Sequence, residues 1–381
     1  MRKAPRVAVV APYLPAPASS GGRIRVQRLS LALARRASVD LYARCFPVEL
    51  RGDPEGRRSA LEVFRTVTLV DPGRTPSLPP WLPRRVREAC PSALGDALAR
   101  AHGQAPYDAV VVAHAYAYGV VAGLRGARVV LDEHNIESAY ARDVVPGGAL
   151  ERWRLQRWER RCWARASAVT AVTEDDRAVV APFAREAHWI PNGTDVAGVP
   201  FRPPSERSGA TVLFVGALSH PPNVRAAMTL VTEVLPRVRE RVPEARVVLC
   251  GRDPSREVLA LAGEGVTVTG TVPEVGPYLS AAAVFANLLE HGGGSSLKVP
   301  EALAAGLPMV STAVGVRGLR LPEGAVTLVG SAPEAADALV RALRDRSLDA
   351  DARARAGRDW AEGLAWERVG ETFTRVVLGD P

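Results

Sequence analysis

The stretch from Glu290 to Gly306, EHGGGSSLKVPEALAAG, gathers three consecutive glycines, two serines, a lysine and a glutamate. Glycines let the backbone approach a ligand closely, and successive N–H groups at the start of a helix bind anions. Lys298 and Glu301 are three residues apart, so they share one face of a helix. The pattern predicts a phosphate beside the lysine and a sugar diol on the glutamate. The alternative is a glycine-rich turn in which these two side chains only pair with each other.

Other residues of this stretch favour a helix that begins at about Lys298. Ser295 and Ser296 are expected to cap this helix or to donate hydroxyl hydrogen bonds. Pro300 falls in the first turn, where a missing N–H matters least. Because the chain has only two lysines against 47 arginines, an interior lysine is more informative here than an arginine would be.

Length and composition indicate a globular enzyme. With 381 residues, the chain is too long for one ordinary core, which favours two domains. We attribute the net charge of +8 to arginines on a solvated surface and expect no nucleic-acid partner. No apolar run approaches the ~20 residues that span a bilayer. The first residues resemble a signal peptide, but Pro12 and Pro15 interrupt the apolar patch, so we expect a buried first strand and a cytoplasmic protein.

Two common kinds of site are not indicated. The four cysteines are widely separated, and none lies near a histidine at the spacing of metal ligands. We therefore expect reduced core cysteines and no metal site. A nicotinamide oxidoreductase would need G-x-G-x-x-G after the first strand, whereas APYLPAPASSGG (11–22) is long and has one glycine pair.

Short apolar runs alternate with segments of helical periodicity along the whole chain. A first series starts with RVAVVAP (6–12), and a second starts with TVLFVG (211–216) after the polar, proline-rich FRPPSERSG (201–209). Apolar runs separated by helices predict parallel sheets covered on both faces. We expect an α/β protein with two doubly wound domains, 1–200 and 201–357, separated by a cleft. In that architecture ligands bind at the carboxyl ends of the strands.

Four segments together resemble a known family. They are Gly21-Gly22, IPNGTD (190–195), FVGALSHPPN (214–223) and HGGGSSLKVPEALAAGLPMVSTAVGVRGL (291–319). The last resembles the donor-site signature of the family 4 glycosyltransferases (glycosyl transferase group 1), and the four in order cover nearly the whole chain. The resemblance implies the GT-B fold, two Rossmann-like domains facing across a cleft. It also implies a C-terminal helix, about 358–381 with Trp360 and Trp366, that returns to the first domain.

The resemblance implies a donor site in the second domain. Glu301 matches the second Glu of the family's E-x7-E element, which holds the donor ribose, while Gly293 stands where the first Glu falls. The family's diphosphate-binding Arg and Lys correspond to Ala217 and Pro222, so the diphosphate is expected on Lys298, backbone amides and Arg252. The implied donor-binding residues are Gly21, Gly22, Gly216, His220, Asn223, Arg252, Thr271, Val272, Gly293, Gly294, Ser295, Ser296 and Leu297.

In the first domain the resemblance points to two histidines. His134 matches the histidine near the transferred sugar, and His114 matches a second histidine at a strand end. The implied catalytic residues are His134, Lys298 and Glu301, and the acceptor-side residues are His114, Glu133 and Asn135. A plain core or capping role is the alternative for either histidine.

Members of this family are retaining enzymes, so the resemblance implies a sugar transfer from a nucleoside-diphosphate donor of the UDP, GDP or dTDP type. No cofactor is expected beyond this co-substrate, and no D-x-D metal motif occurs in a suitable context. The acceptor is expected to be a glycan, a lipid carrier or a specialised metabolite. A nucleotide-sugar epimerase and a non-catalytic nucleotide-binding partner remain alternatives, since usual phosphate-binding cations are missing.

The segment ALERWRLQRWERRCWARA (149–166) is expected to be a helix with a core stripe of Leu155, Trp158, Cys162 and Ala166. Trp153 lies off that stripe, between arginines. Such a basic face with an exposed aromatic suits a peripheral contact with the inner face of the membrane. The alternative is a packed helix on an arginine-rich surface, with a soluble acceptor.

Overall fold

The computed structural model describes residues 4–18, 20–45, 54–71, 79, 81–139, 148–292 and 295–380. The chain forms two units, one made of Met1–Asn192 with Trp366–Pro381 and the other of Gly193–Ala365. Each unit has its own parallel sheet and its own hydrophobic core, as expected for α/β domains. The chain passes between the units at 192/193 and 365/366, whereas the boundaries expected from the sequence are 200/201 and 357/358.

The first unit is built on a seven-stranded parallel sheet in the order β3-β2-β1-β4-β5-β6-β7. Its strands are β1 (Arg6–Ala11), β2 (Ser38–Arg44), β3 (Thr66–Val70), β4 (Ala109–Ala113), β5 (Arg128–Glu133), β6 (Ala168–Ala171) and β7 (Ala187–Trp189). The central strands are runs of valine and alanine that are buried on both faces, which is why they do not alternate with polar residues. Strand order reverses between β1 and β4, so the loops that follow these strands diverge there.

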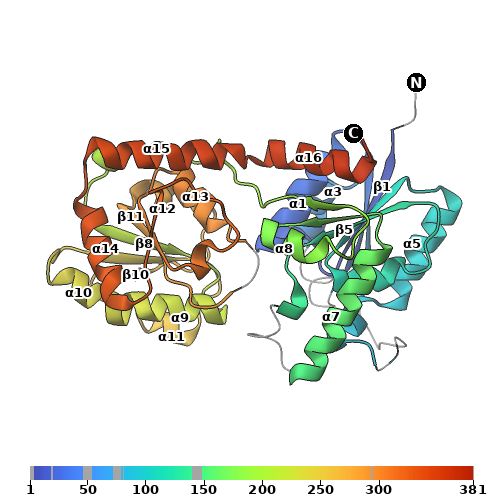
Figure 1. Ribbon diagram of the computed structural model, residues 1–381, viewed down its shortest axis with the longest axis horizontal. Helices are drawn as coiled ribbons and strands as arrows, with labels where there is room; N and C mark the ends of the chain where they lie inside the picture. The colour runs from blue at the N-terminus through green and yellow to red at the C-terminus, as the bar shows by residue number, and fades with distance from the viewer. Residues whose placement is uncertain are drawn as a thin grey trace. The chain divides into compact units, whose positions relative to one another are not determined.

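Helices cover this sheet. They are α1 (Gly21–Ala34), α3 (Pro54–Leu61), α4 (Arg84–Ala89), α5 (Ser92–Gln104), the 3₁₀ helix η1 (Ala115–Val121), α7 (Gly148–Arg165), α8 (Glu174–Val180) and α16 (Trp366–Leu378). The last of these packs on α1 (Figure 1). Gly370 makes this approach possible, because a Cβ there would lie 2.4 Å from the Cβ of Ala32. A segment from the C-terminus thereby completes the first unit.

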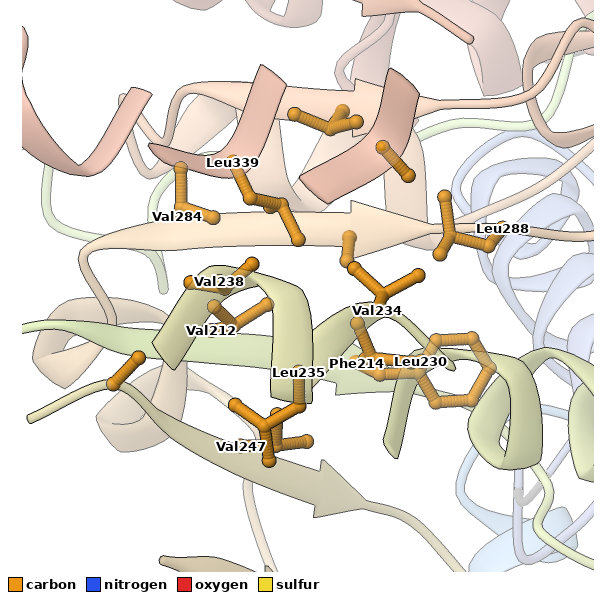
Figure 2. Packing of buried hydrophobic residues seen from close by; sticks show 14 of the residues in the cluster. Val212, Phe214, Leu230, Val234, Leu235, Val238, Val247, Val284, Leu288 and Leu339 are labelled. Carbon is orange, nitrogen blue, oxygen red and sulfur yellow. The ribbon is translucent and has the colours of Figure 1, made fainter. Parts of the chain in front are cut away.

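The second unit has a six-stranded parallel sheet in the order β10-β9-β8-β11-β12-β13. Its strands are β8 (Thr211–Val215), β9 (Arg246–Cys250), β10 (Val266–Val268), β11 (Val284–Asn287), β12 (Met309–Ser311) and β13 (Val326–Leu328). Its helices are η2 (Pro204–Glu206), α9 (Pro221–Thr229), η3 (Leu230–Val234), α10 (Leu235–Arg239), α11 (Arg256–Leu259), α12 (Gly276–Ala281), α13 (Lys298–Ala304), η4 (Val314–Val316), α14 (Ala332–Arg344) and α15 (Leu348–Gly363). Valines and leucines of β8, β9 and β11 pack against α10 and α14 (Figure 2).

The end of the chain divides between the two units. In α15, Gly357 lies against Leu303 of α13, with 3.3 Å between its ideal Cβ position and that leucine's Cδ2. Trp360 packs on the core of the second unit, so the expectation that it packs on the first domain is wrong. Only after Ala365 does the chain join the first unit, where Trp366 is buried. The difference arises because α15 is long enough to cover α13 before the chain leaves.

Helix α7 shows the expected core stripe, with Leu155 and Cys162 buried and Trp158 donating from Nε1 to the carbonyl oxygen of Ala115 at 2.8 Å. Trp163, which that stripe did not include, is also buried. All four cysteines are buried and form no disulfide, as expected. No helix in the described ranges is long and apolar enough to cross a membrane.

Candidate functional site

The second unit brings two loops together at the carboxyl edge of its sheet. Strands β8 and β11 are neighbours, and the strand order reverses between them, which is where ligands bind in open α/β sheets. The loop after β8 leads into α9, and the loop after β11 leads into α13. Lys298, the first residue of α13, donates from Nζ to Oδ1 of Asn223 in α9 at 3.1 Å. This hydrogen bond joins the two helices that follow these loops.

The ammonium of Lys298 lies in an apolar setting. Its Nζ is 4.5 Å from the ring centroid of Phe214, the buried aromatic residue of β8. Burial lowers the pKa of Lys298 to about 7, and the nearby Glu301 opposes that shift. Burial likewise raises the pKa of Glu301 to about 7. Within the described residues no ion pair joins these two side chains, so a turn held only by their mutual pairing does not account for the arrangement.

Glycines bring the backbone of the loop after β8 close to its neighbours. A Cβ on Gly251 would lie 1.7 Å from the carbonyl oxygen of Gly216, and a Cβ on Gly216 would lie 2.9 Å from the amide of Asn223. Asn223 donates from Nδ2 to the carbonyl oxygen of Ala217 at 3.0 Å. In the part of the chain that is described, the N–H groups of Ala217 and Ser219 donate to no other residue. Asn223, whose side-chain oxygen accepts from Lys298, lies in the helix that follows this loop.

The start of α9 supplies fewer donors than an ordinary helix. Its first two residues, Pro221 and Pro222, have no N–H, and the next two amides donate to the carbonyl oxygen of His220. His220 is the residue that precedes the helix, and burial together with Lys298 lowers its imidazole pKa. An anion bound here would therefore be held by Lys298 and the N–H groups of the loop rather than by the N-terminus of α9.

The other donor-side residues of the second unit differ in exposure. Arg252 pairs with the exposed Asp253 at 2.5 Å, and its carbonyl oxygen accepts from Leu218 at 2.8 Å. Thr271 is exposed, while Val272 packs on the core. Gly293 and Gly294 lie outside the described residues.

Before α13, Ser295, Ser296 and Leu297 are partly exposed. Leu297 is the capping residue of α13 and makes no side-chain capping hydrogen bond, so neither serine occupies the capping position. Leu297 lies in the helical region of backbone conformation, with φ −69° and ψ −32°. The helix thus starts without a side-chain cap.

Arg207 is a positioning residue that the sequence did not reveal. It is only 4% exposed, and it donates to carbonyl oxygens at the ends of α12 and α13, including those of Ala282 at 2.6 Å and Ala305. Burial lowers its pKa to about 10. Since α13 carries Lys298 and Glu301, Arg207 fixes the end of the helix that presents them. Nothing in the sequence distinguishes this arginine from the other 46.

In the first unit two histidines meet at the carboxyl edge of the sheet. His114 follows β4 and His134 follows β5, and their ring centroids are 4.1 Å apart. His134 Nε2 lies 2.9 Å from Asp132 Oδ2, and Arg25 Nη2 lies 2.7 Å from the other carboxylate oxygen. The expected pair of histidines is therefore brought together, with a carboxylate and an arginine behind His134.

His114 lies near a second carboxylate, which is itself paired with an arginine. Its Nδ1 lies 3.4 Å from Oε1 of Glu137, and that carboxylate pairs with Arg85. Its Nε2 lies 3.4 Å from the hydroxyl of Tyr13. The backbone of His114 has φ 69°, which a residue with a side chain rarely adopts. Such strain persists only where the surroundings hold it, and it is frequent at ligand sites.

The charges of this cluster are fixed by burial and pairing. Burial alone would raise the pKa of Asp132, but Arg25 and His134 hold it well below the usual range. Burial and the neighbouring His114 lower the pKa of His134 to about 4, so its imidazole is neutral at pH 7. Arg25, Asp132, Tyr13 and Glu137 were not expected from the sequence. Their only local signal is that Asp132 precedes His134 by two residues and so shares its side of the strand.

The two other residues expected on the acceptor side, Glu133 and Asn135, differ in burial. Glu133 is 1% exposed, and its carboxylate accepts from Trp163 Nε1 at 2.8 Å and from the N–H of Ala115 at 3.2 Å. It points to the opposite side of β5 from His134 and packs in the core of the first unit. Asn135 is partly exposed next to His134. Among the described residues, no group of three His, Cys, Asp or Glu side chains is placed to hold a metal ion.

Comparison with known proteins identifies the class. Residues 19–197 match the family described as Glycosyltransferase Family 4, and residues 209–345 match the family described as Glycosyl transferases group 1. The chain belongs to the family 4 glycosyltransferases and has their GT-B fold of two parallel-sheet α/β domains. This agrees with the resemblance carried by the four sequence segments.

Among individual proteins, the phosphatidyl-myo-inositol mannosyltransferase of Mycobacterium leprae is 30% identical over 202 residues, which is 50% of this chain and 53% of that protein. Its counterpart from Mycolicibacterium smegmatis is 29% identical over 202 residues, 50% of this chain and 51% of that protein. The chain thus matches these curated relatives over about half of their length.

Solved structures share the fold over the whole chain. The sucrose-phosphate synthase of Thermosynechococcus elongatus has a TM-score of 0.73 at 20% identity, covering 98% of both chains. Anabaena HepE in complex with UDP has a TM-score of 0.70 at 15% identity, covering 98% of this chain and 100% of that chain. At such identities the likeness concerns the fold.

Proposed function

We propose that the protein transfers a sugar, with retention at the anomeric carbon, from a nucleoside-diphosphate donor to an acceptor hydroxyl. The observation that carries this proposal is the hydrogen bond from Lys298 to Asn223, which places one cation beside unengaged amides where two strand-end loops meet. Family membership supports transfer over the epimerase and non-catalytic alternatives. Glu301, one turn after the lysine, is the acceptor for a ribose diol.

The chemistry follows from the charges. The bond from the anomeric carbon to the diphosphate oxygen breaks, and negative charge develops on that oxygen. Lys298 and the N–H groups of Ala217 and Ser219 stabilise this charge, because they are fixed in place before the reaction begins. The acceptor oxygen forms the new bond on the same face of the sugar, and its proton passes to the leaving phosphate oxygen. No separate base is then required.

Thermal melting tests the donor site. The protein is melted with UDP, GDP, dTDP or ADP, each in large excess. A nucleotide at ~100 times its dissociation constant adds about 2.7 kcal/mol to the free energy of unfolding, which raises the melting temperature by several degrees. We expect one nucleotide to exceed the others, and that result also identifies the base. If none of the four changes the melting temperature, the donor site is not functional and the proposal fails.

For the acceptor, we propose a molecule presented at an anionic membrane surface. Leu150 and Trp153 on α7 are 58% and 55% exposed, and Arg157 lies over the ring of Trp153 at 5.7 Å. An open hollow of about 350 Å³ on this helix is lined by Trp153, Gln156, Arg157, Arg160, Arg161 and Ala164. Exposed aromatics and arginines together suit a lipid headgroup layer. The two mycobacterial relatives carry a phosphatidylinositol lipid in their names.

Vesicle sedimentation tests this surface. We expect binding to phosphatidylcholine vesicles that contain phosphatidylglycerol, little binding to phosphatidylcholine alone, and weaker binding as salt rises. Trp153→Ser should weaken it, whereas the matched control Leu328→Ser, at a residue 57% exposed in the second unit, should not. If the wild type sediments with neither kind of vesicle, a soluble acceptor is favoured, and equal binding by wild type and Trp153→Ser would show that this surface of α7 is not the contact.

A further inference from the structure

We propose that Asp132 is a positioning residue that holds His134 in one tautomer, so that Nδ1 of this histidine is an unprotonated acceptor for a sugar hydroxyl. Arg25 supports this role by keeping Asp132 ionised. The inference rests on the proposed function, because it assigns the chemistry of one contact to the sugar. Asp132 and Arg25 are residues that the family resemblance did not supply.

The tautomer follows from the partners of Asp132. Arg25 donates to both of its oxygens, from Nη2 at 2.7 Å and from Nε at 3.0 Å, and Thr170 donates from Oγ1 at 2.6 Å. A carboxylate that is ionised has no proton to give, so it only accepts. His134 Nε2, at 2.9 Å, must therefore carry the hydrogen of this contact. In a neutral imidazole the other nitrogen then has a lone pair and no hydrogen.

That second nitrogen has no partner in the part of the chain that the structure describes. His134 is 7% exposed, and its Nδ1 is buried with no hydrogen-bond partner among the described residues. A buried polar atom without a partner is rare and calls for an explanation. The nitrogen lies beside Gly22, where a Cβ would be 3.4 Å from it. Any larger residue at position 22 would extend over Nδ1, and glycine leaves it accessible.

The lone pair decides what can bind there. A hydroxyl group can donate to it, and sugars carry hydroxyl groups. A phosphate or carboxylate oxygen offers only lone pairs, so it would leave Nδ1 unsatisfied and is excluded. His114 Nδ1 also has no hydrogen-bond partner among the described residues, but it lies 3.4 Å from Glu137 Oε1, which can only accept, and its Nε2 lies 3.4 Å from the hydroxyl of Tyr13. Of the two neighbouring histidines, His134 is therefore the one whose Nδ1 requires a hydrogen-bond donor.

The tautomer can be read in the free protein. Two-bond ¹H–¹⁵N spectra of protein labelled at histidine, with His134→Gln for assignment, distinguish the two nitrogens of His134. At pH 7.5 we expect Nε2 protonated and Nδ1 unprotonated. In Asp132→Asn, Arg25 should orient the amide oxygen toward itself, so that the amide nitrogen donates to His134 Nε2. The proton should then move to Nδ1.

Turnover gives the second readout. UDP-glucose and GDP-mannose are each assayed for release of the nucleoside diphosphate. Two donors would oppose each other at Nδ1 in Asp132→Asn, so we expect kcat/KM to fall about tenfold to a hundredfold. Thr170→Val is the matched control, since it removes a hydrogen bond to the same carboxylate and leaves the contact with His134. It should keep the wild-type tautomer and rate.

The outcomes separate this inference from the proposed function. A protonated Nδ1 in the wild type, or a normal rate in Asp132→Asn with the tautomer reversed, would overturn the inference. Absence of turnover with both sugars, and of any melting shift with the nucleotides, would count against the proposed function and leave the tautomer result standing. If Asp132→Asn fails to fold because Arg25 is left unpaired, Arg25→Gln/Asp132→Asn removes the buried charge, and the side-chain amide introduced at position 25 then serves as the donor that orients the amide oxygen at position 132.

Discussion

Lys298 and Asn223 are 75 positions apart in the sequence, yet Nζ of the lysine donates to Oδ1 of the asparagine at 3.1 Å. The contact links the loop after β11 to the helix after β8, because these two strands are neighbours in the sheet. It orients a single cation at the point where the strand order reverses. The first prediction concerns this lysine.

Lys298→Met should abolish nucleotide binding and raise the stability of the ligand-free protein. The folded-state pKa of Lys298 is lowered to about 7, so its charged form is disfavoured by folding. The buried ammonium therefore lowers the free energy of unfolding by its full amount below pH 7. This destabilisation shrinks as pH rises and disappears near the unfolded-state pKa of about 10.5. The gain in melting temperature should therefore be larger at pH 6 than at pH 9. Arg256→Met, at an exposed cation, is the control, and a destabilised Lys298→Met would contradict the prediction.

Nucleotide binding should move a proton within the site. A diphosphate beside Lys298 raises the pKa of the lysine and favours proton uptake, while a ribose diol on Glu301 lowers the carboxyl pKa and favours release. Both groups start near pH 7, so the two effects nearly cancel in the wild type. In Glu301→Gln only the uptake remains. Titration calorimetry at pH 7, in buffers of different ionisation enthalpy, measures the number of protons taken up when the nucleotide binds. Equal proton uptake by wild type and variant would show that Glu301 is not part of the site.

Gly22→Ala should destabilise the protein, because the added Cβ would lie 2.5 Å from the hydroxyl of Tyr13. The Tyr13 ring carbon Cζ is 3.4 Å away, which is an ordinary contact, so Tyr13→Phe should remove the clash. In the Tyr13→Phe background, Gly22→Ala should be neutral or stabilising by about 0.5 kcal/mol, the usual gain in a helix. Urea denaturation of the wild type, the two single variants and the double variant measures the four free energies of unfolding of this double-mutant cycle. Activity should stay low in the double variant, because the methyl group still covers His134 Nδ1.

Gly251→Ala should disrupt the donor loop. Its Cβ would lie 1.7 Å from the backbone oxygen of Gly216, and backbone cannot rotate away as a side chain can. We expect a loss of about 2 kcal/mol or more in the free energy of unfolding, and no nucleotide-induced melting shift. Gly263→Ala is the matched control, since no atom lies within 4 Å of its Cβ position. That variant should stay within about 0.5 kcal/mol of the wild type. Similar stabilities for the two variants would contradict the role of Gly251.

The sequence by itself determined the class of fold and part of the site. Valine-rich runs such as 6–11 and 211–215 are continuous, as strands buried on both faces must be, and their alternation with helices gave the two parallel sheets. The family signature around Lys298 and Glu301 is local, so its spacing could be read without any tertiary contact. The same holds for His114 and His134, which both follow strands.

Only the tertiary structure decided which side chains contact the site residues and orient them. Asp132 is one of many carboxylates and Arg25 one of 47 arginines, and their contact depends on how α1 packs beside β5. Glu133 and His134 are adjacent in sequence, yet one lies in the core and the other beside the histidine pair, because neighbouring side chains of a strand point to opposite faces. The place where the chain crosses to the first unit depended on the packing of α15 on α13, which no local pattern records.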